Sequence, residues 1–160
     1  MHLTIGAVSK LKAGPERDLY QRYAERVTPA GRSLNLGPLK CIEISESRKG
    51  SAKERRAEEA ANLLAKIPTA AHIIALDENG DALTSEQFAR LLAKQRDAGA
   101  SGLAFIIGGP DGHGPQIREK AEHIFSLGAV TLPHGLARVV LAEQLYRAMT
   151  ILAGHPYHRS

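Results

Sequence analysis

The stretch LAFIIGGPDGHG, residues 103–114, decides the fold that this sequence predicts. Its first five residues are apolar without interruption, which is typical of a strand buried on both faces of a parallel sheet. A glycine-rich loop follows the strand directly. Because parallel sheets bind ligands beyond the carboxyl ends of their strands, the succession of strand and loop predicts a ligand site at this point.

A second apolar run, HIIAL at residues 72–76, has the same character and is closed by the turn-rich residues 77–81. Helical patterns alternate with strand patterns along the rest of the chain, which predicts an α/β fold: a mostly parallel sheet flanked by helices, in a single domain spanning residues 1–160. We expect strands at 2–8, 39–44, 72–76, 103–107 and 130–132, and helices at 16–26, 52–66, 84–98, 116–123 and 136–153.

The composition is that of an ordinary globular protein: 43% of the 160 residues are hydrophobic and 24% are charged. No apolar run approaches the length of a membrane-spanning helix, and the first residues lack a secretory leader, so we expect a cytoplasmic protein without a membrane partner. The single cysteine, Cys41, excludes an intrachain disulfide framework and fits a reducing compartment.

The motifs of several enzyme classes are missing from the sequence. The loop at residues 108–114 has neither the lysine and hydroxyl of a phosphate loop nor the spacing of a dinucleotide-binding turn. Its glycines indicate either a simple strand-to-helix turn or a close approach of the backbone to a flat ligand. No G-x-S-x-G motif supports a serine hydrolase, and His134, His155 and His158 lack the spacing of a metal site, so no metal is expected.

Two features leave alternatives open. The formal net charge is +4, and residues 48–56 concentrate five cations against Glu54; this segment is either a solvated surface or a nucleic-acid contact, and charge alone favours the first. The helix at 136–153 is apolar on more than one face, so it is either a buried core helix or a helix that also forms a subunit interface.

Four stretches carry a resemblance that nearly spans the chain. They are IIGGPDG (106–112), SLGAVTLPH (126–134), ARVVLAEQLYRA (137–148) and HPYHR (155–159). In this combination they resemble the RlmH family of bacterial ribosomal RNA methyltransferases, within the SPOUT class. The resemblance implies a SPOUT-type fold with a C-terminal trefoil knot, S-adenosylmethionine as cofactor, and a homodimer. It also implies methylation of N3 of a pseudouridine in helix 69 of 23S rRNA, on the assembled ribosome.

The resemblance also assigns residues to roles, with Pro133 and His134 shaping the exit of the cofactor loop. Cofactor contacts are expected from Leu76, Gly108, Gly109, Leu127, Gly128, Ala129, Val130, Thr131 and Leu132. Arg138, Tyr157 and His158 are the expected catalytic residues, and the tail is expected to reach the pocket of the partner subunit. RNA contacts are expected from Arg48, Lys49, Lys53, Arg55 and Arg159.

The chemistry of such a reaction leaves two roles open. The methyl group of a sulfonium is already electrophilic, so catalysis is chiefly alignment of the nucleophile, but N3 of pseudouridine must lose a proton. His158 is a candidate base, whereas Arg138 could instead stabilise the uracil anion. Two other functions remain as alternatives: a methyltransferase of the same class that acts on tRNA, and a non-catalytic RNA-binding module.

Overall fold

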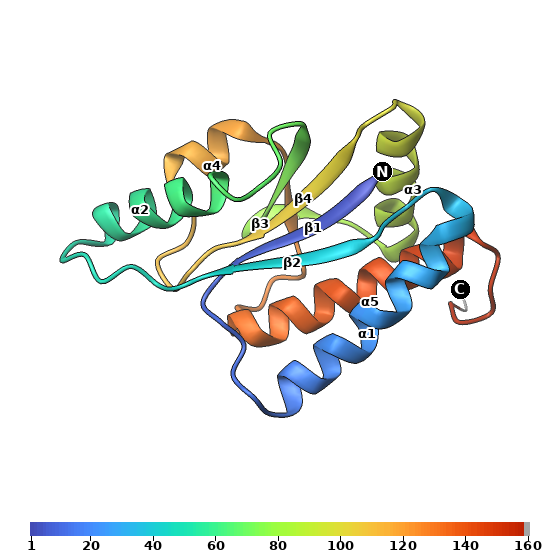
Figure 1. Ribbon diagram of the computed structural model, residues 1–160, viewed down its shortest axis with the longest axis horizontal. Coiled ribbons are helices and arrows are strands. Elements are labelled where there is room, and N and C mark those ends of the chain that lie inside the picture. The colour runs from blue at the N-terminus through green and yellow to red at the C-terminus, as the bar shows by residue number, and fades with distance from the viewer. Residues whose placement is uncertain (159–160) are drawn as a thin grey trace.

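The computed structural model describes residues 1–158, and its centre is a sheet of five parallel strands in the order β2-β1-β4-β3-β5 (Figure 1). Parallel neighbours need a crossover connection between consecutive strands, which is why strands and helices alternate in the sequence. The expected α/β fold is therefore confirmed. The strands are β1 (His2–Val8), β2 (Leu39–Ile44), β3 (Ala71–Ala82), β4 (Gly102–Ile107) and β5 (Ala121–Ser126).

Helices cover both faces of the sheet (Figure 1). One face carries α1 and α5 side by side, with α3 packed against α5, and the opposite face carries α2 and α4. The helices are α1 (Pro15–Gly31), a short 3-10 turn η1 (Arg32–Leu34), α2 (Ala52–Leu64), α3 (Ser85–Asp97), α4 (Pro115–Lys120) and α5 (His134–Leu152).

Strand β4 is apolar along its whole length because it supplies both cores. Leu103, Phe105 and Ile107 belong to the core under α1, α3 and α5, whereas Ala104 and Ile106 belong to the core under α2 and α4. Side chains alternate between the two faces of a strand, so a strand buried on both faces cannot show the polar–apolar alternation of a half-exposed one. This explains why residues 103–107 predicted the fold so directly.

Strand β3 differs from the expectation that it ends at Leu76. The pairing with β4 does end there, at Leu76 opposite Ile107, but the strand resumes against β5 through Ala82. Both Leu76 and Asp81 pair with Phe125, so residues 77–80 form a bulge. The turn-rich residues 77–81 therefore interrupt the strand without ending it, and the bulge projects at the carboxyl edge of the sheet.

The prediction for residues 116–132 was partly wrong. The helix expected at 116–123 ends at Lys120, and the next six residues form the edge strand β5 instead. Residues 130–132, expected as a strand, are a loop. Pairing with a neighbouring strand decides which of these segments becomes a strand. Residues 121–126 pair with the edge of β3, whereas residues 130–132 have no such strand partner in the described structure, and a short run of this kind forms a strand only when it is paired.

The last helix, α5, is buried along most of its length. Its polar residues have partners within the chain: Arg138 pairs with Glu43, Glu143 with Arg147 at 3.0 Å, and Gln144 accepts from the Ser85 hydroxyl at 2.8 Å. The prediction that α5 is a buried core helix is thus confirmed, and its part in a subunit interface stays a prediction. None of the helices within residues 1–158 is long and apolar enough to cross a membrane. The trefoil knot stays a prediction of the resemblance.

Three aromatic rings hold α3 on the sheet, and their removal provides a test of the core. Phe88 stacks on Phe125 at 5.0 Å between ring centroids and meets Phe105 edge-on at 5.8 Å. We expect Phe88→Ala to lower the free energy of unfolding by about 3–5 kcal/mol, because it leaves a cavity between these rings. Urea denaturation measures the loss. The exposed Arg90 of the same helix is the control: Arg90→Ala should change stability by less than about 0.5 kcal/mol. A loss of similar size in the two variants would contradict the assigned packing.

Candidate functional site

A cavity of about 820 Å³ opens at the carboxyl ends of β3 and β4. Its walls come from the bulge after Leu76, the glycine-rich loop after Ile107, the loop after β5 and the start of α5. This is the position at which parallel sheets bind ligands. The cavity is lined by Leu76, Asp77, Glu78, Asn79, Ile107, Gly108, Gly109, Pro110, Asp111, Gly112, His113, Arg118, Leu127, Gly128, Val130, Thr131, Leu132, Pro133, His134 and Ala137.

The structure brings together the residues that were expected to contact a cofactor. All of them except Ala129 line the cavity, although they come from three segments separated in sequence. Pro133 and His134, expected to shape the exit of the loop, line it as well. Ala129 lies in the same loop, between two lining residues, but is exposed.

Side chains tie the three segments to one another. The buried His113 of the glycine-rich loop contacts the carbonyl oxygen of Leu76 through Nε2 at 2.6 Å. From the loop after β5, the hydroxyl of Thr131 donates to Glu78 Oε2 at 2.9 Å. The hydroxyl of Ser126 donates to the Gly128 carbonyl at 2.9 Å and holds the first turn of that loop. Hydrogen bonds thus connect the glycine-rich loop and the loop after β5 to residues 76 and 78 of β3.

The glycine-rich loop folds into a tight turn. The amide of Gly112 donates to the Gly109 carbonyl at 2.9 Å, Pro110 occupies the second position, and Gly112 adopts φ +81°. Proline favours that position and glycine tolerates a positive φ, so the sequence specifies the turn. A Cβ on Gly109 would lie 2.9 Å from Glu59 Oε2 of α2. The loop therefore packs closely on α2, and a side chain at this position would have to displace the Glu59 carboxylate.

The titratable groups of the cavity wall have shifted pKa values. Burial opposes ionisation of Asp77, but the Asn79 amide and the Arg118 guanidinium outweigh it and hold the pKa of Asp77 below its usual value. Burial lowers the pKa of His113, although its bond to the Leu76 carbonyl and the nearby Asp77 act in the opposite direction. The wall thus combines a carboxylate with a neutral imidazole at neutral pH.

Arg138, an expected catalytic residue, does not line the cavity of its own chain. Its side chain is fully buried, pairs with Glu43 of β2 and donates to the Ser9 carbonyl at 2.9 Å. Glu43 also accepts from the Leu11 amide at 2.9 Å, so the pair holds the loop after β1 against α5. The Nε atom of Arg138 has no hydrogen-bond partner within residues 1–158. Arg138 is thus a buried anchor in a single chain.

Tyr157 and His158, the other expected catalytic residues, lie beyond the far end of α5. The Tyr157 hydroxyl donates to Glu143 at 3.0 Å, and His158 contacts Glu86 at 2.6 Å. Burial, followed by bonding to Tyr23 and Glu143, raises the pKa of Tyr157. The 19 residues of α5 span about 28 Å, so these side chains lie far from the cavity of their own chain.

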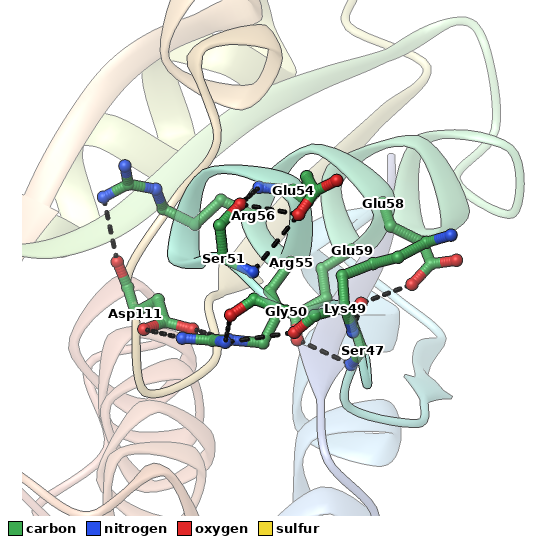
Figure 2. A network of polar contacts seen from close by, with 10 residues as sticks. All are labelled: Ser47, Lys49, Gly50, Ser51, Glu54, Arg55, Arg56, Glu58, Glu59 and Asp111. Atoms are coloured by element: carbon green, nitrogen blue, oxygen red, sulfur yellow. Dashed lines mark hydrogen bonds and ion pairs between the residues drawn. The ribbon is translucent and has the colours of Figure 1, made fainter.

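The basic segment divides into two groups. Arg48, Lys49 and Lys53 are exposed, and within residues 1–158 none of them forms an ion pair. Arg55 instead binds Asp111 of the glycine-rich loop, as Figure 2 shows, at 2.6 Å from Nε and 3.0 Å from Nη2. Arg159, expected to contact RNA, lies outside the described residues.

Sequence reasoning missed the polar part of the cavity wall. Asp77, Glu78 and Asn79 line it because the bulge in β3 turns them there, and the cluster of turn-forming residues was the available signal. His113 and Arg118 were missed because their roles depend on contacts with residues 76 and 77, about 40 positions away along the chain. No local pattern predicts such contacts.

Comparisons with known proteins agree with the resemblance seen in the sequence. A family model described as "Predicted SPOUT methyltransferase" matches residues 1–158. The chain is 56% identical to ribosomal RNA large subunit methyltransferase H of Xanthobacter autotrophicus, and 49% identical to that of Brucella anthropi; each alignment covers 100% of both chains.

Similarity to solved structures is more distant. The SpoU methyltransferase AviRb from Streptomyces viridochromogenes, in complex with AdoMet, matches at a TM-score of 0.42 and 14% identity, over 96% of this chain and 61% of that one. The family model and the full-length relatives are sufficient by themselves. On that evidence the chain belongs to the SPOUT methyltransferases, in the family of ribosomal RNA large subunit methyltransferase H.

Proposed function

We propose that this chain methylates ribosomal RNA of the large subunit with S-adenosylmethionine as methyl donor, at N3 of a pseudouridine in helix 69 of 23S rRNA on the assembled ribosome. The observation that carries the proposal is the cavity at the carboxyl edge of the sheet, lined by eight of the nine residues that the family resemblance assigns to the cofactor. The names of the full-length relatives support the substrate class.

The cavity suits the proposed cofactor in size and chemistry. Its volume of about 820 Å³ lies in the range of small-molecule pockets. Leu76, Leu127 and Leu132 offer apolar contacts for an adenine ring and a methionine chain, and the glycine turn lets the backbone approach a flat group. Asp77 and Glu78 place carboxylates on the wall, which suits a cofactor with sulfonium and ammonium charges.

The bound cofactor would supply an electrophilic methyl group, so the residues of the chain have to orient the base and remove its proton. Holding N3 in line with the methyl group is the larger part of this task. His158 is a candidate for the proton acceptor, and Arg138 is a candidate for stabilising the uracil anion. Because His158 contacts Glu86 in the single chain, it would have to leave this contact to act on RNA.

We further propose that the active site is shared between two chains of a homodimer. Arg138 and His158 lie near opposite ends of α5, and neither lines the cavity of its own chain. A two-fold axis across α5 would bring the tail of one chain toward the cavity of the other, because a two-fold interface pairs each residue reciprocally. Leu19 of α1 and Leu136 of α5 are exposed apolar side chains that such an interface could cover.

The proposed RNA surface consists of Arg48, Lys49 and Lys53, together with Arg159 of the tail. The first three project from the loop after β2 and from α2, and that loop reaches the same edge of the sheet as the cavity (Figure 1). Exposed cations without ion partners are suited to phosphate contacts. The alternative substrate is tRNA, which the same cationic surface could bind.

Methyl transfer to ribosomes is the direct test. Labelled S-adenosylmethionine is incubated with the protein and with ribosomes from a strain that lacks this gene, and the modified base is mapped. We expect label at N3 of a helix 69 pseudouridine, because the proposed surface and cavity serve that substrate. Free tRNA and ribosomes from the parent strain are the controls. Label on tRNA alone would replace the substrate, and no label on any RNA would contradict the proposal.

The shared site predicts that two inactive variants restore one another. Thr131→Trp should obstruct the part of the cavity lined by the loop after β5, and His158→Ala should remove a tail residue; each is expected to be inactive alone. After mixing and subunit exchange at equal amounts, we expect roughly a quarter of wild-type activity, because half of the dimers are mixed and each contains one intact site. Activity that stays at the level of the separate variants would show that cavity and tail act within one chain.

His113 predicts a pH dependence of stability. Since burial lowers its pKa in the folded chain, the unfolded chain binds the proton more readily. The stabilising effect of the neutral imidazole is therefore complete above about pH 6.5, and it is lost as the pH falls toward the folded-state pKa. We expect His113→Gln, which keeps a donor for the Leu76 carbonyl, to lose less stability than wild type between about pH 7.5 and 5.5. Urea denaturation across this range measures both slopes; equal slopes would contradict the burial effect.

A further inference from the structure

The guanidinium of Arg55 is almost fully engaged by hydrogen bonds within the chain. Nε and Nη2 donate to the two carboxylate oxygens of Asp111, at 2.6 and 3.0 Å. Nη1 donates to the carbonyl oxygens of Lys49 and Gly50, at 3.1 and 3.3 Å. A guanidinium has five N–H donors, so these four hydrogen bonds leave one for any outside partner. Arg55 is also only 30% exposed.

Asp111 is the tip of the turn that forms one wall of the cavity. It follows Pro110 and precedes Gly112, whose amide closes the turn on the Gly109 carbonyl. Arg56 adds a bond from Nη1 to the Asp111 carbonyl at 3.4 Å, so two consecutive arginines of α2 converge on this residue (Figure 2). The tip of the turn is thus held from outside the cavity by charge-assisted bonds.

Close packing between α2 and the glycine-rich loop also holds this wall of the cavity in place. A Cβ on Gly114 would lie 2.6 Å from the Arg56 carbonyl oxygen, and a Cβ on Gly109 would lie 2.9 Å from the buried carboxylate of Glu59. Glu59 also accepts from the Ser47 amide at 2.9 Å, which fixes the loop after β2 on the same helix (Figure 2). Helix α2 therefore serves as the outer support of the glycine-rich loop.

We propose that Arg55 is a positioning residue of the cofactor cavity: it holds the turn at residues 109–112 in its binding conformation through Asp111, and it does not contact RNA. The inference rests on the proposed function for the identity of the cofactor. It replaces the RNA-binding role that the family resemblance implies for Arg55, and it leaves that role with Arg48, Lys49 and Lys53.

Arg55→Lys is the decisive variant because it keeps the positive charge and loses the bidentate hydrogen bonding to the Asp111 carboxylate. We expect roughly tenfold weaker S-adenosylmethionine binding by titration calorimetry without RNA, a loss typical of residues that orient a binding group. Affinity for a helix 69 RNA fragment should stay at the wild-type value, since the guanidinium of Arg55 is engaged within the chain and does not contact RNA. Asp111→Asn should reproduce the cofactor defect. The double variant should be no worse than either single one, because both remove the same interaction.

Lys53→Gln is the matched control, since Lys53 is an exposed cation in the first turn of the same helix. It should weaken RNA binding, reduce its salt dependence and leave cofactor binding unchanged. Amide hydrogen exchange gives a readout that needs no ligand. Exchange at Gly112 should rise in Arg55→Lys and not in Lys53→Gln, while the free energy of global unfolding stays close to that of wild type.

Two outcomes would overturn the inference. Wild-type cofactor affinity and wild-type exchange at Gly112 in Arg55→Lys would show that the turn does not depend on Arg55. A loss of RNA affinity in Arg55→Lys with intact cofactor binding would return Arg55 to the RNA surface. Failure of the proposed function is recognised separately: the wild-type chain would then not bind S-adenosylmethionine, and exchange at Gly112 alone would decide whether Arg55 holds the turn.

Discussion

The pairing of Leu76 with Ile107, the last rung between β3 and β4, is the constraint on which the site depends. Beyond this rung the two strands separate. Strand β3 continues into the bulge at 77–80, β4 continues into the glycine-rich loop, and the cavity lies between these two segments. The His113 imidazole then bridges the gap, because its Nε2 contacts the Leu76 carbonyl oxygen at 2.6 Å. This contact therefore sets the distance between two walls of the cavity.

Local patterns predicted four of the five strands and the two cavity walls that follow Leu76 and Ile107, whereas the family resemblance assigned the loop at 127–132. Residues 103–107 and 73–76 are apolar throughout, which is typical of a strand covered on both faces, and the loops that follow them must meet at one edge. The errors occur where a distant partner decides. Residues 121–126 form a strand because the edge of β3 is available to them, and the bulge of β3 depends on β5 in turn. Neither partner can be read from local periodicity.

The same distinction explains the assignment of the charged residues. Residues 48–56 look uniformly basic in sequence, yet the structure separates the exposed Lys53 from Arg55, two positions further along the helix. Residues two apart on a helix do not share a face, so neighbouring cations in sequence point to different surroundings. The carboxylate that captures Arg55 lies 56 positions away. Charge density along a chain thus indicates that a segment is basic, but not which of its cations are free for a ligand.

Helix α5 has the cofactor cavity at its first turn and the tail with proposed catalytic residues beyond its last turn. Its first turn supplies His134 and Ala137 to the cavity, its next residue is the buried Arg138, and its far end carries the tail with Tyr157 and His158. A rigid helix of this length fixes the tail far from the cavity of its own chain. In the proposed dimer, a second copy in which the helix runs in the opposite direction would supply the tail to this cavity. His158 and Tyr157 would then have to leave their contacts with Glu86 and Glu143, and Tyr157 would also leave the Tyr146 ring, which it meets edge-on at 4.9 Å between centroids.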